Sequence, residues 1–248
     1  MKLFGLIGYP LSHSFSEKYF REKFLHEHIP DTAYKVFPLE KAEDFIGLCE
    51  REKELLGLNV TIPYKEKIIP FLDGLDEEAA KVGAVNTIKF SAGKKTGYNS
   101  DIFGFEHSLV PLLRPDHTAA LILGTGGASK AVAYVFKKLG IEFKYVSSSQ
   151  RQDHALSYSD LNASVIQKST LIINTSPVGM YPAVEQSPAI PYEYITDKHL
   201  LYDLIYNPEE TLFLKKGKEK GAQTKNGLEM LYLQAERSWQ IWNTDSFK

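Results

Sequence analysis

The chain has 248 residues, of which 43% are hydrophobic and 24% are charged. This composition is that of an ordinary globular protein, and it excludes a disordered chain, a collagen-like rod and a coiled-coil rod. The 29 basic and 31 acidic residues give a formal charge of −2. No overall basic field is therefore available for nucleic acid or for a membrane surface.

Cysteine content and the N-terminal segment indicate the compartment. The single cysteine, Cys49, excludes an internal disulfide and a zinc site of clustered thiolates. The apolar run after Lys2 is broken by Gly8 and Tyr9, so it is too short for a signal peptide or a membrane span. We therefore expect a reduced, cytoplasmic protein with no membrane partner.

Strand and helix patterns alternate along the first half of the chain. Short apolar or alternating runs predict strands, and apolar residues at helical spacing predict helices. We expect strands at 3–8, 33–38, 58–62 and 84–90, helices at 16–28 and 42–56, and a hairpin through 94–98.

The second half contains compact, fully apolar runs that are typical of a buried parallel sheet. We expect an amphipathic stretch at 103–113, strands at 119–123, 142–146, 171–174 and 200–205, and helices at 128–139 and 227–242. Strands that alternate with helices of about 10–15 residues predict βαβ units. The predicted fold class is α/β, with an α/β domain over 1–102 completed by a C-terminal helix at 228–248, and a Rossmann-like doubly wound domain over 103–227. We expect a cleft between the two.

A glycine-rich turn, Gly124-Thr-Gly-Gly-Ala-Ser129, separates a predicted buried strand from a helix. The first glycine permits a tight turn, and the second lets the backbone approach a pyrophosphate at the helix N-terminus. Ser129 stands in place of the third glycine of the usual G-x-G-x-x-G pattern. The strand–turn–helix context favours dinucleotide binding, and a plain tight turn is the alternative.

The loop after the next strand bears on the choice of dinucleotide. NAD-binding units carry an acidic residue about 20 positions beyond the first glycine, where it holds the ribose 2′-hydroxyl. Here the segment Ser147-Ser-Ser-Gln-Arg151 offers hydroxyls and a guanidinium, which suit a 2′-phosphate. NADP is therefore favoured over NAD, although Asp153 leaves NAD open and a solvated loop is the alternative.

Polar side chains follow several strands of the first domain. Ser14 and Ser16 follow the first strand, where they could bind a ligand or cap a helix; the nearby His13 is interpreted as structural. Lys65 and Asp101 lie on separate strand-end loops, and such loops line the ligand crevice of open α/β sheets. The two could form an acid–base pair. A solvated lysine and a helix-capping aspartate are the alternatives.

Together these motifs resemble the shikimate dehydrogenase family, in the same order and over nearly the whole chain. The segments that carry the resemblance are Gly8-Tyr-Pro-Leu-Ser-His-Ser-Phe-Ser16, Asn59-Val-Thr-Ile-Pro-Tyr-Lys65, Gly83-Ala-Val-Asn-Thr87, Asn99-Ser-Asp101, Gly124 to Ala131, Asn174-Thr-Ser-Pro-Val-Gly-Met180, Asp203-Leu-Ile-Tyr-Asn-Pro208, and Asn226-Gly-Leu-Glu-Met230 with Gln234.

The resemblance implies an NADP-dependent enzyme that reversibly reduces 3-dehydroshikimate to shikimate in chorismate and aromatic amino-acid biosynthesis. Lys65 and Asp101 would be the catalytic pair, and no metal would be needed because Lys65 supplies the positive charge. The implied substrate contacts are Ser14, Ser16, Thr61, Asn86, Tyr206 and Gln234. The implied cofactor contacts are Gly124, Thr125, Gly126, Gly127, Ala128, Ser148, Ser149, Arg151, Ile205, Gly227 and Glu77. The first domain would bind the substrate and the second would bind NADP.

Some positions depart from the family pattern, and alternatives remain. Glu17 stands where the family often has proline, Ser100 replaces a common threonine, and the loop ending at Arg151 is unusual. One alternative is an NAD-tolerant quinate/shikimate dehydrogenase. Another is a non-catalytic ligand-sensing module, against which the presence of both Lys65 and Asp101 argues. The sequence leaves monomer and homodimer open.

Overall fold

The computed structural model describes residues 1–11, 15–148 and 155–244. The chain divides into two compact units. The first unit comprises Met1–Ser100 and Gln234–Lys248, and the second comprises Asp101–Leu233. Two helices, α4 (Ser100–Leu109) and α8 (Leu228–Asn243), contribute residues to both units.

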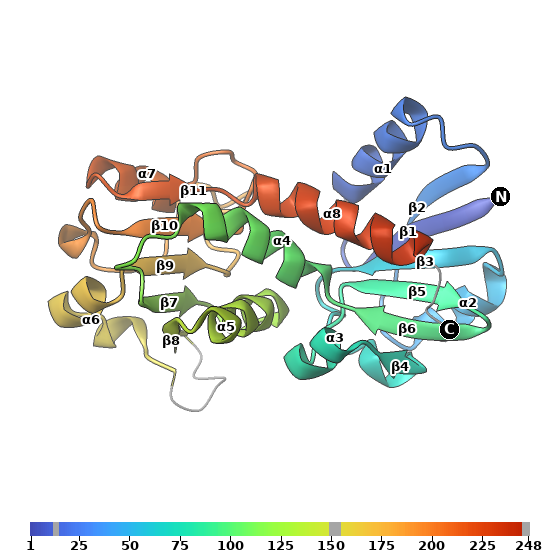
Figure 1. Ribbon diagram of the computed structural model, residues 1–248, viewed down its shortest axis with the longest axis horizontal. Coiled ribbons are helices and arrows are strands. Elements are labelled where there is room, and N and C mark those ends of the chain that lie inside the picture. Colours follow the sequence, from blue (N-terminus) through green and yellow to red (C-terminus); the bar gives the residue numbers. More distant parts are fainter. Residues whose placement is uncertain (12–14, 149–154, 245–248) are drawn as a thin grey trace. The chain divides into compact units, whose positions relative to one another are not determined.

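The first unit is built on a mixed six-stranded sheet. Its strands are β1 (Lys2–Gly8), β2 (Thr32–Pro38), β3 (Leu55–Val60), β4 (Gly74–Leu75), β5 (Thr87–Ser91) and β6 (Lys94–Tyr98), in the spatial order β2-β1-β3-β5-β6-β4 (Figure 1). β1 pairs in parallel with β2 and β3, whereas β5 runs antiparallel to β3 and β6. The helices along this part of the chain are α1 (Phe15–His26), α2 (Asp44–Arg51) and α3 (Glu77–Val82).

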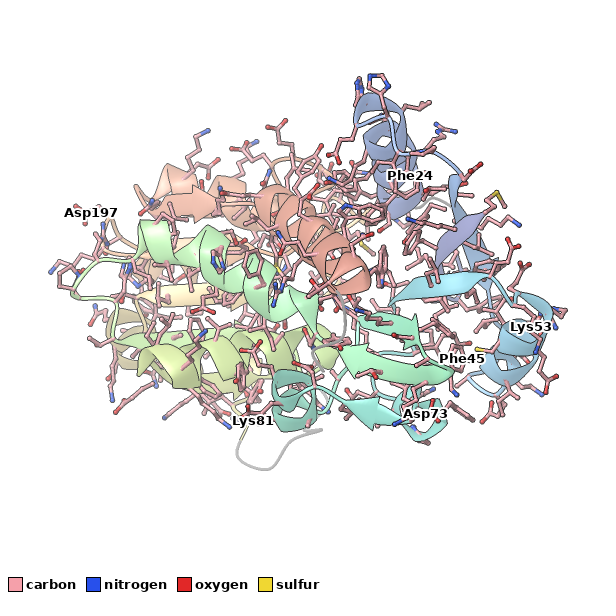
Figure 2. The ribbon with its side chains drawn as sticks, turned by 45° about the vertical axis from the view of Figure 1, so that its right-hand side comes forward. Phe24, Phe45, Lys53, Asp73, Lys81 and Asp197 are labelled. Carbon is pink, nitrogen blue, oxygen red and sulfur yellow. The ribbon has the colours of Figure 1, made fainter. Side chains whose placement is uncertain are left out.

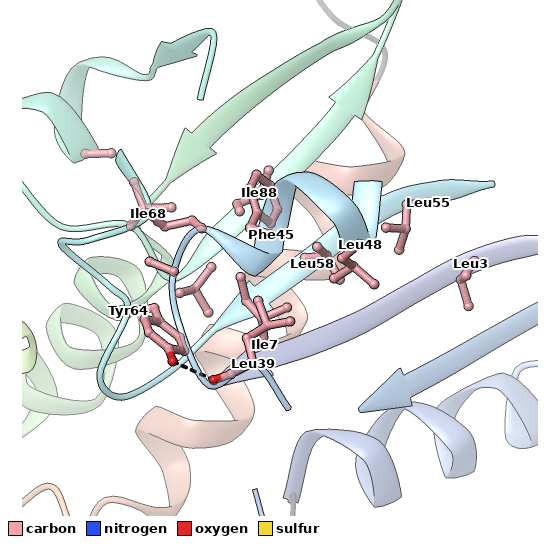
Figure 3. Close-up of a cluster of buried hydrophobic side chains, with 14 residues drawn as sticks. Leu3, Ile7, Leu39, Phe45, Leu48, Leu55, Leu58, Tyr64, Ile68 and Ile88 are labelled. Carbon is pink, nitrogen blue, oxygen red and sulfur yellow. Dashed lines mark hydrogen bonds between the residues drawn. The ribbon is translucent and has the colours of Figure 1, made fainter. Parts of the chain in front are cut away.

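Both faces of this sheet are buried, which is why β1 is apolar on both sides. Leu3 and Ile7 pack on the α2 side, in a cluster that also contains Phe45 and Leu58 (Figure 3). Phe4 lies on the opposite face, in a cluster with residues of α1 and α8. Successive strand residues point to opposite faces, so a strand between two layers reads as a continuous apolar run.

The second unit is a parallel sheet of five strands wound in both directions. Its strands are β7 (Ala119–Leu123), β8 (Glu142–Val146), β9 (Leu171–Asn174), β10 (Leu200–Asp203) and β11 (Gln223–Lys225), in the order β11-β10-β9-β7-β8. The helices between them are α5 (Gly127–Leu139), α6 (Ala163–Lys168) and α7 (Leu212–Glu219). The chain leaves β7 in one direction toward β8 and then continues on its other side through β9. The gap between β7 and β9 is therefore the topological switch point, where open α/β sheets bind ligands. The predicted α/β fold class, with a Rossmann-like doubly wound unit, is confirmed.

The structure corrects several predicted boundaries. The helix expected at 42–56 ends at Arg51, because Leu55 and Leu56 belong to β3, which pairs with β1. The strand expected at 84–90 begins at Thr87, and the one expected at 200–205 ends at Asp203. The short elements β4, α3, α6, α7 and β11 were not predicted.

Candidate active site

Polar segments of the first unit collect at one edge of its sheet. β3 and β6 end at this edge and the antiparallel β5 begins there, so Thr61, Asn86 and Asn99 are brought together. The backbone N–H of Val60 donates to Asn86 O at 2.8 Å, and that of Asn86 donates to Tyr98 O at 3.1 Å. The mixed strand directions therefore unite motifs that lie far apart in the sequence.

Lys65 lies in the loop after β3. Hydrogen bonds at Lys65 and at its neighbour Tyr64 hold this loop in place. The backbone N–H of Val85 donates to Lys65 O at 2.7 Å. Next to Lys65, the buried Tyr64 donates its hydroxyl hydrogen bond to Leu39 O, as Figure 3 shows. Lys65 itself is only partly buried. The lysine is thus held by a rigid backbone beside the entry to β5.

Asn86 holds the segment that leads to Asp101. Its side-chain Oδ1 accepts a hydrogen bond from the backbone N–H of Ser100 at 2.7 Å, and its Nδ2 donates to Ser100 Oγ at 3.0 Å. Asn99 Nδ2 donates to Ala84 O at 2.9 Å, which ties the same segment to the β5 entry. Asp101 follows in the first turn of α4 and is buried. A carboxylate there also interacts favourably with the helix dipole.

The glycine turn of the second unit lies at the switch point. Gly124 has a φ of +108°, and a Cβ there would lie 2.9 Å from Thr175 Oγ1, at the end of β9. A Cβ on Gly126 would meet nothing within 4 Å. Gly126 is the N-cap of α5 and supplies no side-chain cap, while the buried Ser129 donates to Gly126 O at 2.6 Å. Open space beside the start of a helix of this length fits a bound pyrophosphate.

A buried carboxylate, Asp203, organises the neighbouring strand ends and was given no role by the sequence analysis. It accepts hydrogen bonds from Thr211 Oγ1 at 2.6 Å, from Asn174 Nδ2 at 3.0 Å and from the backbone N–H of Ile205 at 3.1 Å. Burial nevertheless raises the pKa of Asp203 to about 6, because desolvation outweighs these bonds. The signal in the sequence was an acidic residue ending a fully apolar strand.

The remaining implied contacts have distinct surroundings. Gly227 is required by packing, because a Cβ there would lie 2.1 Å from Leu204 O. Tyr206 is about one-third exposed, and burial of the rest raises the pKa of its phenol. Glu77 lies on the exposed surface of α3 and pairs with Lys81 at 2.5 Å; Figure 2 labels Lys81. Ser148 directly follows the buried Ser147, just after the end of β8.

Three of the implied contacts, Ser14, Ser149 and Arg151, lie outside the described residues, as does His13. Within the described ranges, no group of three or more His, Cys, Asp or Glu side chains could hold a metal ion. No helix in those ranges is long and apolar enough to cross a membrane.

The fold and the glycine turn define a two-unit α/β protein with a Rossmann-like second unit. A family model described as the shikimate dehydrogenase substrate binding domain matches residues 6–88. The shikimate dehydrogenase (NADP(+)) of Clostridium beijerinckii is 39% identical over 252 residues, covering 98% of this chain and 92% of that protein.

Solved structures agree with this assignment. Shikimate dehydrogenase from Aquifex aeolicus has a TM-score of 0.87 at 35% identity, covering 100% of this chain and 94% of the other. The enzyme from Thermus thermophilus, solved with NADP(H) and shikimate, has a TM-score of 0.86 at 28% identity, covering 98% and 94%. The chain belongs to the shikimate dehydrogenase family.

Proposed function

We propose that this protein is an NADP-dependent shikimate dehydrogenase, which reversibly reduces the ketone of 3-dehydroshikimate to the alcohol of shikimate. The observation that carries the proposal is the match to relatives of that name along nearly the whole chain, with both Lys65 and Asp101 present in it. Both residues follow segments that hydrogen bonds of the first unit hold in place.

Lys65 is the proposed proton donor. Its ammonium Nζ donates a proton to the oxygen that becomes the shikimate hydroxyl, and in the reverse direction the amine takes that proton back. Proton transfer by a positioned side chain contributes ~10²–10⁴-fold to rate. Asp101 accepts a hydrogen bond from a ring hydroxyl and holds the Lys65 ammonium in place. A lysine and an aspartate divide the work in this way without a metal ion.

Substrate binding is assigned to hydroxyls and amides. Ser14, Ser16 and Tyr206 would hold the carboxylate end of the substrate, and Thr61, Asn86 and Gln234 would bind the remaining ring substituents. Hydrogen bonds to a charged group are worth ~1.5–3 kcal/mol, more than the ~0.5–1.5 kcal/mol of neutral ones. The serine and tyrosine contacts should therefore account for most of the affinity for an anionic ligand.

The dinucleotide supplies the hydride. The open space at Gly126 and the N-terminus of α5 fit its pyrophosphate, so the residues Gly124 to Ala128 would hold that group. Ile205, Gly227 and Glu77 are further proposed cofactor contacts among the described residues. Ser148, Ser149 and Arg151 would receive the 2′-phosphate, because hydroxyls and a guanidinium suit an anion that a carboxylate would repel.

A spectrophotometric assay of shikimate and quinate against NADP⁺ and NAD⁺ tests this function. We expect rapid oxidation of shikimate with NADP⁺, and a lower kcat/KM with NAD⁺ or with quinate. Equal kcat/KM values for shikimate and quinate, or for the two dinucleotides, would instead support the broader quinate/shikimate dehydrogenase. Shikimate binding without turnover would support a ligand-sensing module.

A cytosolic location is part of the same proposal. It is supported by the single cysteine, Cys49, which has no second cysteine in the chain with which to form an internal disulfide. Sedimentation velocity would decide between the monomer and the homodimer.

A further inference from the structure

Ser238 of α8 lies at the centre of a buried polar network in the first unit. Its side chain is 0% exposed, and its Oγ donates to the carbonyl oxygen of Gln234 at 2.9 Å, one helical turn earlier. A hydroxyl has a single proton and two lone pairs, so with its proton on the Gln234 carbonyl this oxygen accepts at most two bonds at a time from its remaining neighbours. Asn59 Nδ2 donates to it at 2.9 Å. Thr87 Oγ1 and Ser100 Oγ lie at 2.8 Å and 3.0 Å.

These partners come from separate elements at the polar edge of the sheet. Asn59 is near the end of β3, Thr87 begins β5 and Ser100 begins α4. A hydrogen bond from the Tyr34 hydroxyl to Asn59 Oδ1, at 2.8 Å, orients the Asn59 amide so that its Nδ2 points to Ser238. Ser238 thus connects its own helix, α8, with β3, β5 and the start of α4.

The network ends on two side chains to which substrate binding is assigned, Asn86 and Gln234. Asn86 Oδ1 lies 3.1 Å from Thr87 Oγ1 and 3.2 Å from Ser100 Oγ. Gln234 Oε1 lies 3.4 Å from Ser100 Oγ. Their positions therefore depend on hydroxyl groups that do not themselves bear the assigned roles.

We propose that Ser238 is a positioning residue for substrate, whose hydroxyl locks α8 to the ends of β3, β5 and α4 and thereby sets the placement of Asn86 and Gln234. This rests on the proposed function. Removing the hydroxyl leaves Asn59 Nδ2 without its closest acceptor and releases the Thr87 proton. Buried polar networks fix a unique arrangement only while every member is satisfied. The consequence is loss of affinity for shikimate, because the amides that bind it take up other orientations.

The first test is Ser238→Ala, which removes the hydroxyl and keeps a good helix former in α8. We expect the KM for shikimate to rise ~2–12-fold, the equivalent of one neutral hydrogen bond. The KM for NADP⁺ should stay within about twofold of wild type, and kcat should change less than the KM for shikimate.

Ser108→Ala is the matched control. Ser108 is a buried helix serine of the second unit, bonded to Tyr202 Oη at 2.7 Å, and its loss should lower the Tm without changing the KM for shikimate.

A second pair of variants tests the network from its other side. Thr87→Val is nearly isosteric and lacks the hydroxyl, so it should reproduce the rise in the KM for shikimate. Thr87→Ser keeps the hydroxyl and should restore the wild-type KM even though it loses a buried methyl group. A rise with both substitutions would mean that packing, and not the hydrogen bond, is responsible, and it would overturn the proposal.

Calorimetric binding of shikimate to the whole protein separates this inference from the reaction itself. If wild type binds shikimate without oxidising it, the proposed reaction fails, while the comparison of Ser238→Ala with wild type still tests positioning. If Ser238→Ala lowers the Tm but binds shikimate with wild-type affinity, the network is purely structural and the proposal is wrong. A wild-type protein that neither binds nor oxidises shikimate overturns both.

Discussion

The two units hold their strand-end segments by different chemistry. In the first unit the framework is neutral: hydroxyls and amides of Thr87, Ser100 and Ser238 bond to one another around Asn86. In the second unit one buried carboxylate, Asp203, accepts hydrogen bonds from Thr211, Asn174 and the backbone N–H of Ile205. The neutral network does not titrate in the physiological range, whereas the pKa of Asp203 is raised to about 6.

Because of this difference, the groups that respond to pH are not the same in the two units. In the first unit, the proposed proton donor lies on a scaffold that is insensitive to pH, so the pH dependence of the reaction should come from the reacting groups. In the second unit, the scaffold itself carries a charge that burial disfavours. Variants in the two units should therefore fail in different ways, in turnover for one and in pH-dependent stability for the other.

The largest effect is expected at Lys65. Lys65→Ala should lower kcat by ~10²–10⁴-fold, because the proton donor to the reacting oxygen is lost. The KM for shikimate should rise much less, since the other polar contacts remain. Steady-state kinetics with shikimate and NADP⁺ measures both parameters.

Lys67→Ala is the matched control, because Lys67 is an exposed lysine of the same loop. Its kcat should equal that of wild type. A Lys65→Ala variant with near-normal kcat would remove Lys65 from the chemistry and leave the first unit with a framework but no identified proton donor.

The next effect concerns the stability of the second unit against pH. The pKa of Asp203 lies at about 6 in the folded protein and near the ordinary value of 3.8 in the unfolded chain. The folded state therefore binds the proton more tightly, and the contribution to stability is fully present below pH ~4 and lost as the pH rises through ~6. A difference of ~2 pKa units corresponds to ~3 kcal/mol.

Urea unfolding between pH ~4 and ~7 measures this contribution. Asp203→Asn cannot ionise, so the free energy of unfolding of wild type minus that of the variant should fall by ~3 kcal/mol across the range. Thr87→Val, in the neutral framework, should keep the pH dependence of wild type. A difference between wild type and Asp203→Asn that stays constant with pH would show that Asp203 remains ionised throughout, and the contrast between the two frameworks would disappear.

Much of the parallel sheet could be predicted from the sequence. The strands at 119–123, 142–146 and 171–174 have the predicted bounds. The first and the third are fully buried, and short apolar runs of this kind are typical of a parallel sheet. The predicted end of α2 was wrong because the pattern there fits both a helix and a strand. Leu55 and Leu56 continue the helical spacing, and only their long-range pairing in β3 with β1 decides the matter.

Short helices were missed where capping, and not periodicity, defines them. The side chain of Asp76 accepts from the backbone N–H of Ala79 at 3.0 Å, and Gly83 ends α3 with a φ of +67°. Both signals are visible in the sequence as an aspartate and a glycine flanking a short segment.

The candidate site was only partly visible in the sequence. The motifs identified Asn86 and Gln234 as substrate contacts, but they did not identify the hydrogen-bond partners of Ser238. One of these partners, Asn59 of β3, lies 179 residues away from Ser238 in the sequence. Such contacts follow from sheet register and from the docking of α8, which no local pattern encodes. Likewise, nothing in the sequence around Asp203 states that Thr211 and Asn174 would reach it.

Each unit also has a glycine at a tight helix–sheet contact, and these two glycines should differ in importance. A Cβ on Gly57 of β3 would lie 2.3–2.5 Å from three atoms of the Trp242 indole, which donates a hydrogen bond to Ile88 O at 3.0 Å. Gly57→Ala should therefore cost ~1–3 kcal/mol of unfolding free energy, since the rigid ring has to move. Thermal and urea unfolding would measure this loss.

The counterpart in the second unit is Gly217 of α7. A Cβ there would lie 2.4 Å from Leu201 Cδ2, with its next contact at 3.4 Å. Rotation of the leucine relieves this contact, and alanine gains ~0.8–1 kcal/mol of helix propensity over glycine. Gly217→Ala should thus be nearly neutral. If it destabilised the protein as much as Gly57→Ala does, side-chain rigidity would not be what sets the cost.

The smallest effect is expected at Glu77, a proposed cofactor contact on the exposed surface of α3. Lys81 one turn away lowers the pKa of the Glu77 carboxyl, so the group is ionised at neutral pH. Exposed ion pairs of this kind contribute little and are screened by salt.

If Glu77 does touch the dinucleotide, Glu77→Gln removes a negative charge near a phosphate-bearing ligand, and the KM for NADP⁺ should fall at low salt. Because the carboxylate is already paired and solvated, we expect a change below about twofold at physiological ionic strength. Lys81→Gln is the control, since it leaves Glu77 charged but unpaired and should raise the KM for NADP⁺ at low salt by a similarly small factor. Equal KM values for both variants and for wild type at every salt concentration would place Glu77 outside the cofactor site. Binding of NADP⁺ would then fall to the glycine turn and the strand-end segments of the second unit.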